Sequence, residues 1–215
     1  MGLFESVLSD TKVQNEYNKY KEVENDYDAT HDMRHVLGVI EICKKVCKLF
    51  NLNRQQTDDI KIAALLHDIC VADEGKTDHA ERSYLWAKEY LADKALNDDS
   101  KTQILKAIRH HSKGTNTLYG RVLTFADKLD INEKRILPRG LSERGVRQYA
   151  CIKTVDINIK NDTLIVKFKT NGKIDIPEMN EYYFTAKIFD AVDKLANFFR
   201  LKSQIYIDNN EWKIK

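Results

Sequence analysis

The chain has 215 residues, of which 42% are hydrophobic and 32% are charged, and its formal net charge is +2 at pH 7. This is the composition of an ordinary globular protein with a core of useful size, and the small net charge gives no general attraction for polyanions. No window approaches the ~18 consecutive apolar residues of a membrane span, and no secretory signal is visible, so we expect a cytoplasmic protein with reduced cysteines and no membrane partner.

Six segments in the first two thirds of the chain carry hydrophobic residues at helical spacing. In the second of them, for example, Val36, Val39 and Ile40 begin one continuous apolar face. Only two prolines and eight glycines interrupt the chain, which favours long helices. The sequence predicts helices near 3–22, 33–51, 55–69, 78–92, 98–112 and 117–131.

The pattern changes after about residue 150. The stretch "TVDINIKNDTLIVKF" alternates apolar and polar residues around Asn161 and Asp162, which predicts a β-hairpin, and "TNGK" at 170–173 predicts another tight turn. Residues 178–200 are again predicted to be helical, and "QIYIDNNEWKIK" resembles a closing hairpin. We therefore expect a mainly α protein, with a helical domain at 1–148 and a small α+β appendage at 149–215.

A basic segment, "EKRILPRGLSERGVRQ", lies at residues 133–148. It is either a solvated linker or a basic lip over an anionic substrate, and the sequence leaves both interpretations open. It is also the only feature that favours nucleic-acid binding, which we do not expect on this evidence alone.

Several histidines and aspartates fall on apolar helix faces. His111 lies three residues after Ile108 and four after Ala107, so it points inward, whereas the adjacent His110 points outward. A single inward histidine is more often a hydrogen-bonded core residue than a metal ligand, but a set of six inward groups changes that balance. The set comprises His35, His67, Asp68, His79, His111 and Asp127. Imidazoles and carboxylates suit borderline divalent metals such as Fe, Mn, Ni, Co or Zn, and the absence of a thiolate argues against a purely structural zinc site.

The order of these residues resembles the H…HD…D signature of the HD superfamily of metal-dependent phosphohydrolases, in the local contexts "HDMRHVLGV", "AALLHDI", "DHAERSYLWA", "AIRHHSKG" and "FADKLD". The resemblance covers about residues 31–135. His79 and His111 are similar to the added ligands of the subgroup that holds two metals. Within it, "AIRHHSKG…LTFADKLD" is similar to the bacterial hydrolases that split dinucleoside tetraphosphates symmetrically. The alarmone hydrolases and cyclic-dinucleotide phosphodiesterases of the superfamily fit less well, because their additional motifs are not matched here.

The resemblance implies a role for each ligand. His35, His67, Asp68 and Asp127 would hold a first metal, and His79 and His111 would hold a second, with Asp68 bridging. The expected cofactors are two divalent ions, drawn from Fe, Mn, Ni, Co or Mg. If His110 rather than His111 matches the family ligand, the helical-face argument is wrong.

Phosphoryl transfer also needs cations on the non-bridging oxygens of the phosphate. Besides Asp68, the expected catalytic residues are Lys128, Arg109 and Lys113, which follow or flank proposed ligands. The expected substrate-binding residues are Arg34, Arg82, Arg135 and Arg139.

We therefore predict a phosphohydrolase that cleaves a phosphoester or phosphoanhydride bond of a small nucleotide-like substrate. Two alternatives remain open: a di-iron HD-type oxygenase, since some members use the same ligand set, and a nucleotide-binding regulator. Residues 149–215 form either a homodimer interface or a wall of the pocket, and the sequence does not decide between them.

Overall fold

The computed structural model describes residues 2–214, apart from the side chain of Glu74. It divides into two compact units, each described here by itself. Unit 1 comprises residues 1–24 and 31–126, and unit 2 comprises residues 25–30 and 127–215.

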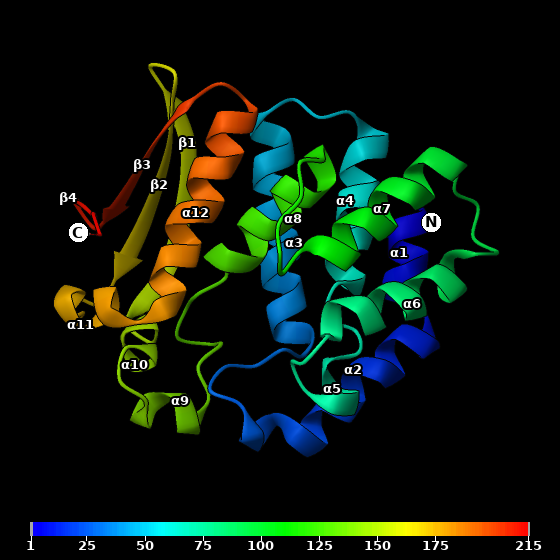
Figure 1. The fold of residues 1–215 in the computed structure, drawn as a ribbon, viewed down its shortest axis with the longest axis horizontal. Coiled ribbons are helices and arrows are strands. Elements are labelled where there is room, and N and C mark those ends of the chain that lie inside the picture. Colours follow the sequence, from blue (N-terminus) through cyan, green and yellow to red (C-terminus); the bar gives the residue numbers. More distant parts are fainter. Residues whose placement is uncertain (1, 215) are drawn as a thin grey trace. The chain divides into compact units, whose positions relative to one another are not determined.

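Unit 1 is built from helices (Figure 1). Apart from the first predicted segment, their bounds lie within a few residues of the predicted ones. Helix α3 packs against α4, α4 against α7, and α6 against α7. Their facing sides bury a continuous apolar core, and burial of such area is the main favourable term in folding. The helices that carry residues of unit 1 are α1 (Leu3–Leu8), α2 (Thr11–Val23), α3 (Met33–Leu49), α4 (Arg54–Leu66), α5 (Val71–Glu74), α6 (His79–Leu91), α7 (Asp98–His110) and α8 (Leu118–Leu129), with a short 3-10 helix at Glu24–Asp26.

The single helix predicted at 3–22 is wrong, because the chain breaks between α1 and α2. Asp10 is the N-cap of α2, and its side chain accepts a hydrogen bond from the backbone N–H of Lys12 at 2.9 Å. An aspartate in this position satisfies a backbone donor that a helix start leaves open, so it favours a new helix over continuation of the old one. Its other oxygen accepts from the Tyr90 hydroxyl at 2.6 Å, which fixes the break against α6.

Unit 2 has a four-stranded sheet with strand order β1-β2-β3-β4. The Asn161–Asp162 turn joins β1 and β2 as predicted, and both turn residues adopt positive φ (48° and 56°), as a two-residue hairpin turn requires. The predicted closing hairpin is also present, as the antiparallel pair β3 and β4. The elements of unit 2 are α9 (Pro138–Ser142), α10 (Val146–Tyr149), β1 (Ile152–Lys160), β2 (Thr163–Thr170), α11 (Ile176–Glu181), α12 (Tyr183–Phe198), β3 (Lys202–Ile207) and β4 (Asn210–Glu211).

The parallel pairing of β2 with β3 places the closing hairpin in the same sheet as the first one. Helices α11 and α12 form the crossover between the two parallel strands, and α12 packs against β2 and β3 (Figure 1). Alternate residues of these strands, such as Val166, Phe168 and Ile205, are buried, as are Ile188 and Val192 of α12. The mainly α fold with a small C-terminal sheet is therefore confirmed.

The division between the units falls inside α8, earlier in the chain than the domain boundary predicted at residue 148. Residues 25–30 join unit 2 through a pairing that the sequence pattern does not reveal. Residues 25–30 run beside residues 135–137, where the N–H of Thr30 donates to Arg135 O at 2.8 Å and that of Leu137 to Asp28 O at 3.0 Å. Whether 1–148 and 149–215 fold as separate domains stays a prediction. Among residues 2–214, no helix combines the length and apolar character needed to cross a membrane.

Candidate metal centre

The first ligand candidates lie where α3 and α4 meet the core of unit 1. His35 is on the buried side of α3, in line with Val39, Ile42 and Val46, and is 1% exposed. His67 is the C-cap of α4, and this helix ends about one helical turn earlier than predicted. Asp68 follows His67 in the turn after the helix. Both are buried, so the polar pair sits at a helix end enclosed by apolar side chains.

The second pair of histidines comes from the ends of two other helices. His79 is the first residue of α6, and His111 is the C-cap of α7. His111 is buried, whereas His110 is exposed, which agrees with the inward direction inferred for His111 from helical spacing. We refer to His35, His67, Asp68, His79 and His111, all of unit 1, as the histidine–aspartate cluster.

The Asp68 carboxylate lies at the centre of the histidine–aspartate cluster. Its Oδ2 is 3.7 Å from His35 Nε2 and 3.4 Å from His67 Nε2. Its Oδ1 is 3.4 Å from His79 Nε2 and 3.3 Å from His111 Nε2. Each oxygen therefore faces two imidazoles, which is the arrangement expected of a carboxylate that bridges two cations.

Backbone contacts fix which nitrogen of three of these rings faces the carboxylate. Nδ1 of His67 lies 2.7 Å from Ala64 O, that of His79 lies 2.6 Å from Lys76 O, and that of His111 lies 2.7 Å from Ile108 O. A carbonyl oxygen only accepts, so Nδ1 carries the proton in each ring, and a neutral ring presents the Nε2 lone pair to the cluster. Metal-binding histidines are commonly oriented in this way by a carbonyl partner.

The electrostatics of Asp68 match this geometry. Burial by itself would raise the pKa of its carboxyl group, but positive charge at the positions of His67, His111 and His79 outweighs burial and holds that pKa well below the usual value of 3.8. Among residues 2–214, no donor makes a hydrogen bond of normal geometry to the buried Oδ1. An ionised, buried carboxylate oxygen of this kind is costly without a positive partner.

The donor set fits a divalent cation. The ligand atoms of His67, Asp68 and His111 all lie within 4.8 Å of one another, and all three residues are buried. Imidazole nitrogens and carboxylate oxygens without a thiolate suit Mn, Fe, Co, Ni or Zn rather than a closed structural zinc site.

Asp127 belongs to unit 2 but follows directly on Ala126, the last residue of unit 1, in the same helix α8. It is 5% exposed, and its Oδ2 accepts from Lys128 Nζ at 2.6 Å. Lys128, predicted to be catalytic, is thus held beside the last predicted ligand.

Two predicted cations of unit 1 form surface ion pairs. Arg109 Nε lies 2.7 Å from Glu81 Oε2, and its guanidinium stacks over the ring of Tyr84. Arg34 pairs with Asp32 at 2.7 Å and with Glu24 at 3.1 Å. Lys113, another predicted cation of unit 1, is exposed.

Arg82 binds backbone oxygens in the loop that leads from Asp68 to His79. Its guanidinium donates to Gly75 O at 2.6 Å, to Cys70 O at 3.2 Å and also to Thr77 O. Arg82 therefore holds the loop in place, a role that its position in the sequence does not indicate.

The basic segment 133–148 is largely neutralised within unit 2. Arg144 and Arg147 pair with Glu181 and Glu178, each at a closest distance of 2.7 Å or less. Arg135 is buried and donates to the carbonyl oxygens of Thr30 and Asp130. Arg139 pairs with Asp28 at 3.3 Å and donates to Asp26 O. These contacts favour a structural role for the segment over a basic lip.

Ser112 is a candidate site residue that the sequence pattern does not single out. Its Oγ lies 3.2 Å from His111 Nε2 and 3.4 Å from His79 Nε2. The only signal in the sequence is its position directly after His111, and a serine there has many ordinary explanations.

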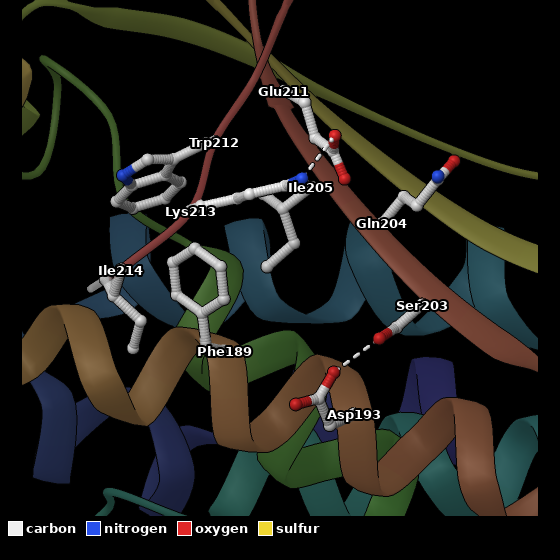
Figure 2. A pocket seen from close by; sticks show the side chains of 9 residues that line it. All are labelled: Phe189, Asp193, Ser203, Gln204, Ile205, Glu211, Trp212, Lys213 and Ile214. Carbon is white, nitrogen blue, oxygen red and sulfur yellow. Dashed lines mark hydrogen bonds and ion pairs between the residues drawn. The ribbon is translucent and has the colours of Figure 1, made fainter.

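A hollow of about 290 Å³ lies in unit 2 between α12 and the β3–β4 edge of the sheet (Figure 2). Phe189, Ile205, Trp212 and Ile214 form its apolar part, and the Lys213–Glu211 and Ser203–Asp193 pairs flank it. None of the predicted site residues is among those that line it.

Comparison with known proteins supports a metal-binding role for the histidine–aspartate cluster. The family model of the HD domain matches residues 33–132, a range that contains all six predicted metal ligands. No curated protein matches the chain. A solved structure described as a predicted HD superfamily hydrolase from an uncultured Thermotogales bacterium is 31% identical, over 60% of this chain and 74% of that one. The TM-score of the two structures is 0.45, so the assignment rests on the sequence matches. The chain belongs to the HD-domain superfamily.

Proposed function

We propose that this protein is a metal-dependent phosphohydrolase that cleaves a phosphoester or phosphoanhydride bond of a small nucleotide-like substrate. The observation that carries the proposal is the position of Asp68, whose two oxygens each face two imidazole Nε2 atoms. In this proposal His35, His67, Asp68 and Asp127 hold one cation, and His79 and His111 hold a second one together with Asp68.

Helix continuity supports the inclusion of Asp127. Asp127 follows Leu123 by four residues, about one helical turn, so the two side chains share a face of α8. Leu123 is fully buried. A carboxylate at this position is expected to project toward the same interior.

Bound divalent cations would supply a water of lowered pKa near neutral pH and would neutralise charge on the phosphoryl oxygens. The chain's own residues complete the site. We assign Lys128, which pairs with Asp127, to a phosphoryl oxygen, because a lysine in an ion pair with a ligand can exchange that partner for substrate. The Ser112 hydroxyl lies beside the Nε2 atoms of His79 and His111, next to the position that the proposal gives to the second cation.

The contacts of the other predicted cations decide which of them the proposal assigns to substrate. Lys113 and Arg109 lie close in sequence to His111, so they remain candidates for contact with the substrate phosphates, as does Arg34 beside His35. Arg82 and Arg135 use their donors on backbone carbonyls, so the proposal assigns neither of them to substrate. Arg139 is proposed only as a surface cation.

Two measurements, made one after the other, test the proposal. Protein purified without chelator is first analysed for metal, and phosphate release from a panel of nucleotides is then measured anaerobically with Mn²⁺ or Co²⁺. We expect two equivalents of metal and oxygen-independent hydrolysis that Asp68→Asn abolishes. Turnover that requires dioxygen would instead identify the di-iron oxygenase alternative. Binding of nucleotides without turnover by fully metal-loaded protein would identify the regulator.

A further inference from the structure

An aromatic cluster lies in unit 2 at the start of α12. It consists of Tyr149, Tyr182, Tyr183 and Phe184, whose neighbouring ring centroids are 4.7–6.5 Å apart. Tyr149 is buried, and its hydroxyl lies 3.2 Å from Thr185 Oγ1. Tyr183, at the other side of the cluster, is 65% exposed, the largest fraction among the exposed large hydrophobic side chains of residues 2–214.

The cluster is held in a fixed arrangement. Tyr182 packs directly over Gly145, where a Cβ atom would come within 2.6 Å of Tyr182 Cβ, and Gly145 has a φ of 81° that disfavours other residues. The rings of Tyr149 and Tyr182 meet edge to face at 5.8 Å. The rings of Tyr182 and Tyr183 meet in the same way at 4.7 Å. An exposed ring that is already oriented by its neighbours loses little conformational entropy when it binds a ligand.

Two lysines lie beside rings of the aromatic cluster. Lys187 Nζ lies 4.9 Å from the centre of the Tyr183 ring. Lys128 Nζ lies 5.6 Å from the centre of the Phe184 ring and 2.6 Å from Asp127 Oδ2. Lys128 therefore connects a proposed metal ligand with the aromatic cluster through one side chain, and all of these residues belong to unit 2.

We propose that the aromatic cluster binds the nucleobase of the substrate, with Tyr183 as the stacking residue and Lys128 on the adjoining phosphate. This inference rests on the proposed function and specifies its substrate class: a phosphate ester that carries a planar aromatic base. Aromatic rings beside lysines complement such a molecule, because every base has a π face for stacking and the cations attract its phosphates. Stacking alone gives little preference among bases, so the site is expected to accept several.

Binding of a paired set of ligands tests the inference on the metal-loaded protein. The probes are adenosine 5′-(α,β-methylene)diphosphate, which resists cleavage between its two phosphorus atoms, and methylenediphosphonate, which lacks the nucleoside. Titration calorimetry should give a dissociation constant about tenfold lower for the nucleotide analogue, a factor typical of one base–aromatic stack.

Three variants test whether Tyr183 is the source of the preference for the nucleotide analogue. Tyr183→Leu should lose this tenfold preference while binding methylenediphosphonate unchanged, whereas Tyr183→Phe keeps a ring and should retain the preference. Tyr206→Leu, at a half-buried tyrosine on β3, is the matched control and should also retain it. Equal affinities of the wild-type protein for the two probes, or an unchanged preference in Tyr183→Leu with normal thermal unfolding, would overturn the inference.

The two proposals fail in different ways. If the Tyr183-dependent preference is found but no nucleotide is hydrolysed, the proposed function is wrong and the base site stands. If nucleotides and base-free phosphate esters are hydrolysed with the same kcat/KM, the base site is wrong and the hydrolase stands.

Discussion

The Nε2 atoms of His79 and His111 lie 3.0 Å apart, although the two residues come from different helices. Both rings direct Nδ1 to a backbone carbonyl oxygen, so in the neutral state both Nε2 atoms present lone pairs to each other. Such a contact is repulsive unless a proton or a cation lies between the nitrogens or beside them. The nearby Asp68 Oδ1 adds a third electron-rich atom to the same place, which favours a divalent cation over a single proton.

The first prediction concerns the second metal. We expect His111→Ala to reduce the bound divalent metal from two equivalents per chain to one, because it removes one of the two imidazoles assigned to that cation. Metal content after gel filtration, measured by mass spectrometry, gives the stoichiometry. His110→Ala is the matched control, since His110 is adjacent in sequence but exposed, and it should keep both equivalents.

The adjacent histidines make this a sharp comparison. Loss of metal in His110→Ala together with full occupancy in His111→Ala would contradict the assignment. It would also show that helical spacing had identified the wrong histidine.

The second prediction concerns removal of the metal. Ligand binding to the folded state alone stabilises it by about 2.7 kcal/mol at a ligand concentration of 100 times Kd. For a chain of this size we therefore expect Mn²⁺ to raise Tm by roughly 5–10 °C over the chelated protein. Asp68→Asn should abolish most of this rise, because the amide removes the charge that the proposed cations would share. The same Mn²⁺-dependent rise in Asp68→Asn, measured by calorimetry, would argue against Asp68 as a bridging ligand.

Much of unit 1 could be predicted from the sequence because its elements are local. Hydrophobic residues at helical spacing identify a helix and also its buried side, so the spacing alone assigns His35 and His111 to the interior. The break at Asp10 is easily missed because no proline or glycine marks it. The step of six residues from Val7 to Val13 does not fit helical spacing, however, and Asp10 caps the second helix through its hydrogen bond with the Lys12 N–H. The role of Arg82 could not be predicted, because its acceptors are backbone carbonyl oxygens, which every residue has whatever its side chain.

Long-range pairings could not be predicted in the same way. The sequence indicates each hairpin of unit 2 but contains no local signal for the parallel register that joins β2 to β3. The same holds for the basic segment, whose arginines look available for an anionic partner. Their acceptors, such as Glu178 and Glu181, lie more than 30 residues further along the chain.

The third prediction concerns Arg82 as a positioning residue. Arg82→Ala leaves three carbonyl groups without their donor, and we expect it to lower the free energy of unfolding by about 1–3 kcal/mol. Because the loop that Arg82 holds ends at His79, the variant should also lose part of the second metal equivalent. Denaturant unfolding and metal analysis measure the two effects.

Arg54→Ala is the control for Arg82→Ala. The Arg54 side chain is 92% exposed, so the change should alter stability by less than about 0.5 kcal/mol. If Arg82→Ala is as stable and as rich in metal as Arg54→Ala, and only the KM for substrate rises, Arg82 binds substrate instead of the loop.

The fourth prediction concerns the acid stability of unit 2. The Glu178 carboxylate accepts two hydrogen bonds from Arg147 and one from the N–H of Gly145, and these contacts lower its pKa from 4.5 to about 2. Since the folded-state pKa lies below the unfolded one, the stabilisation is complete above about pH 4.5 and is lost as the pH falls through about 2. Glu178→Gln should therefore lower Tm at pH 7, with a difference from the wild-type protein that shrinks steadily below pH 4.5. Glu181→Gln, which removes the exposed partner of Arg144, should change Tm much less at either pH. Calorimetric scans between pH 2 and pH 7 measure these differences in Tm. If Glu178→Gln lowers Tm by the same amount at both ends of this range, the charge on Glu178 is not what holds α10 to α11.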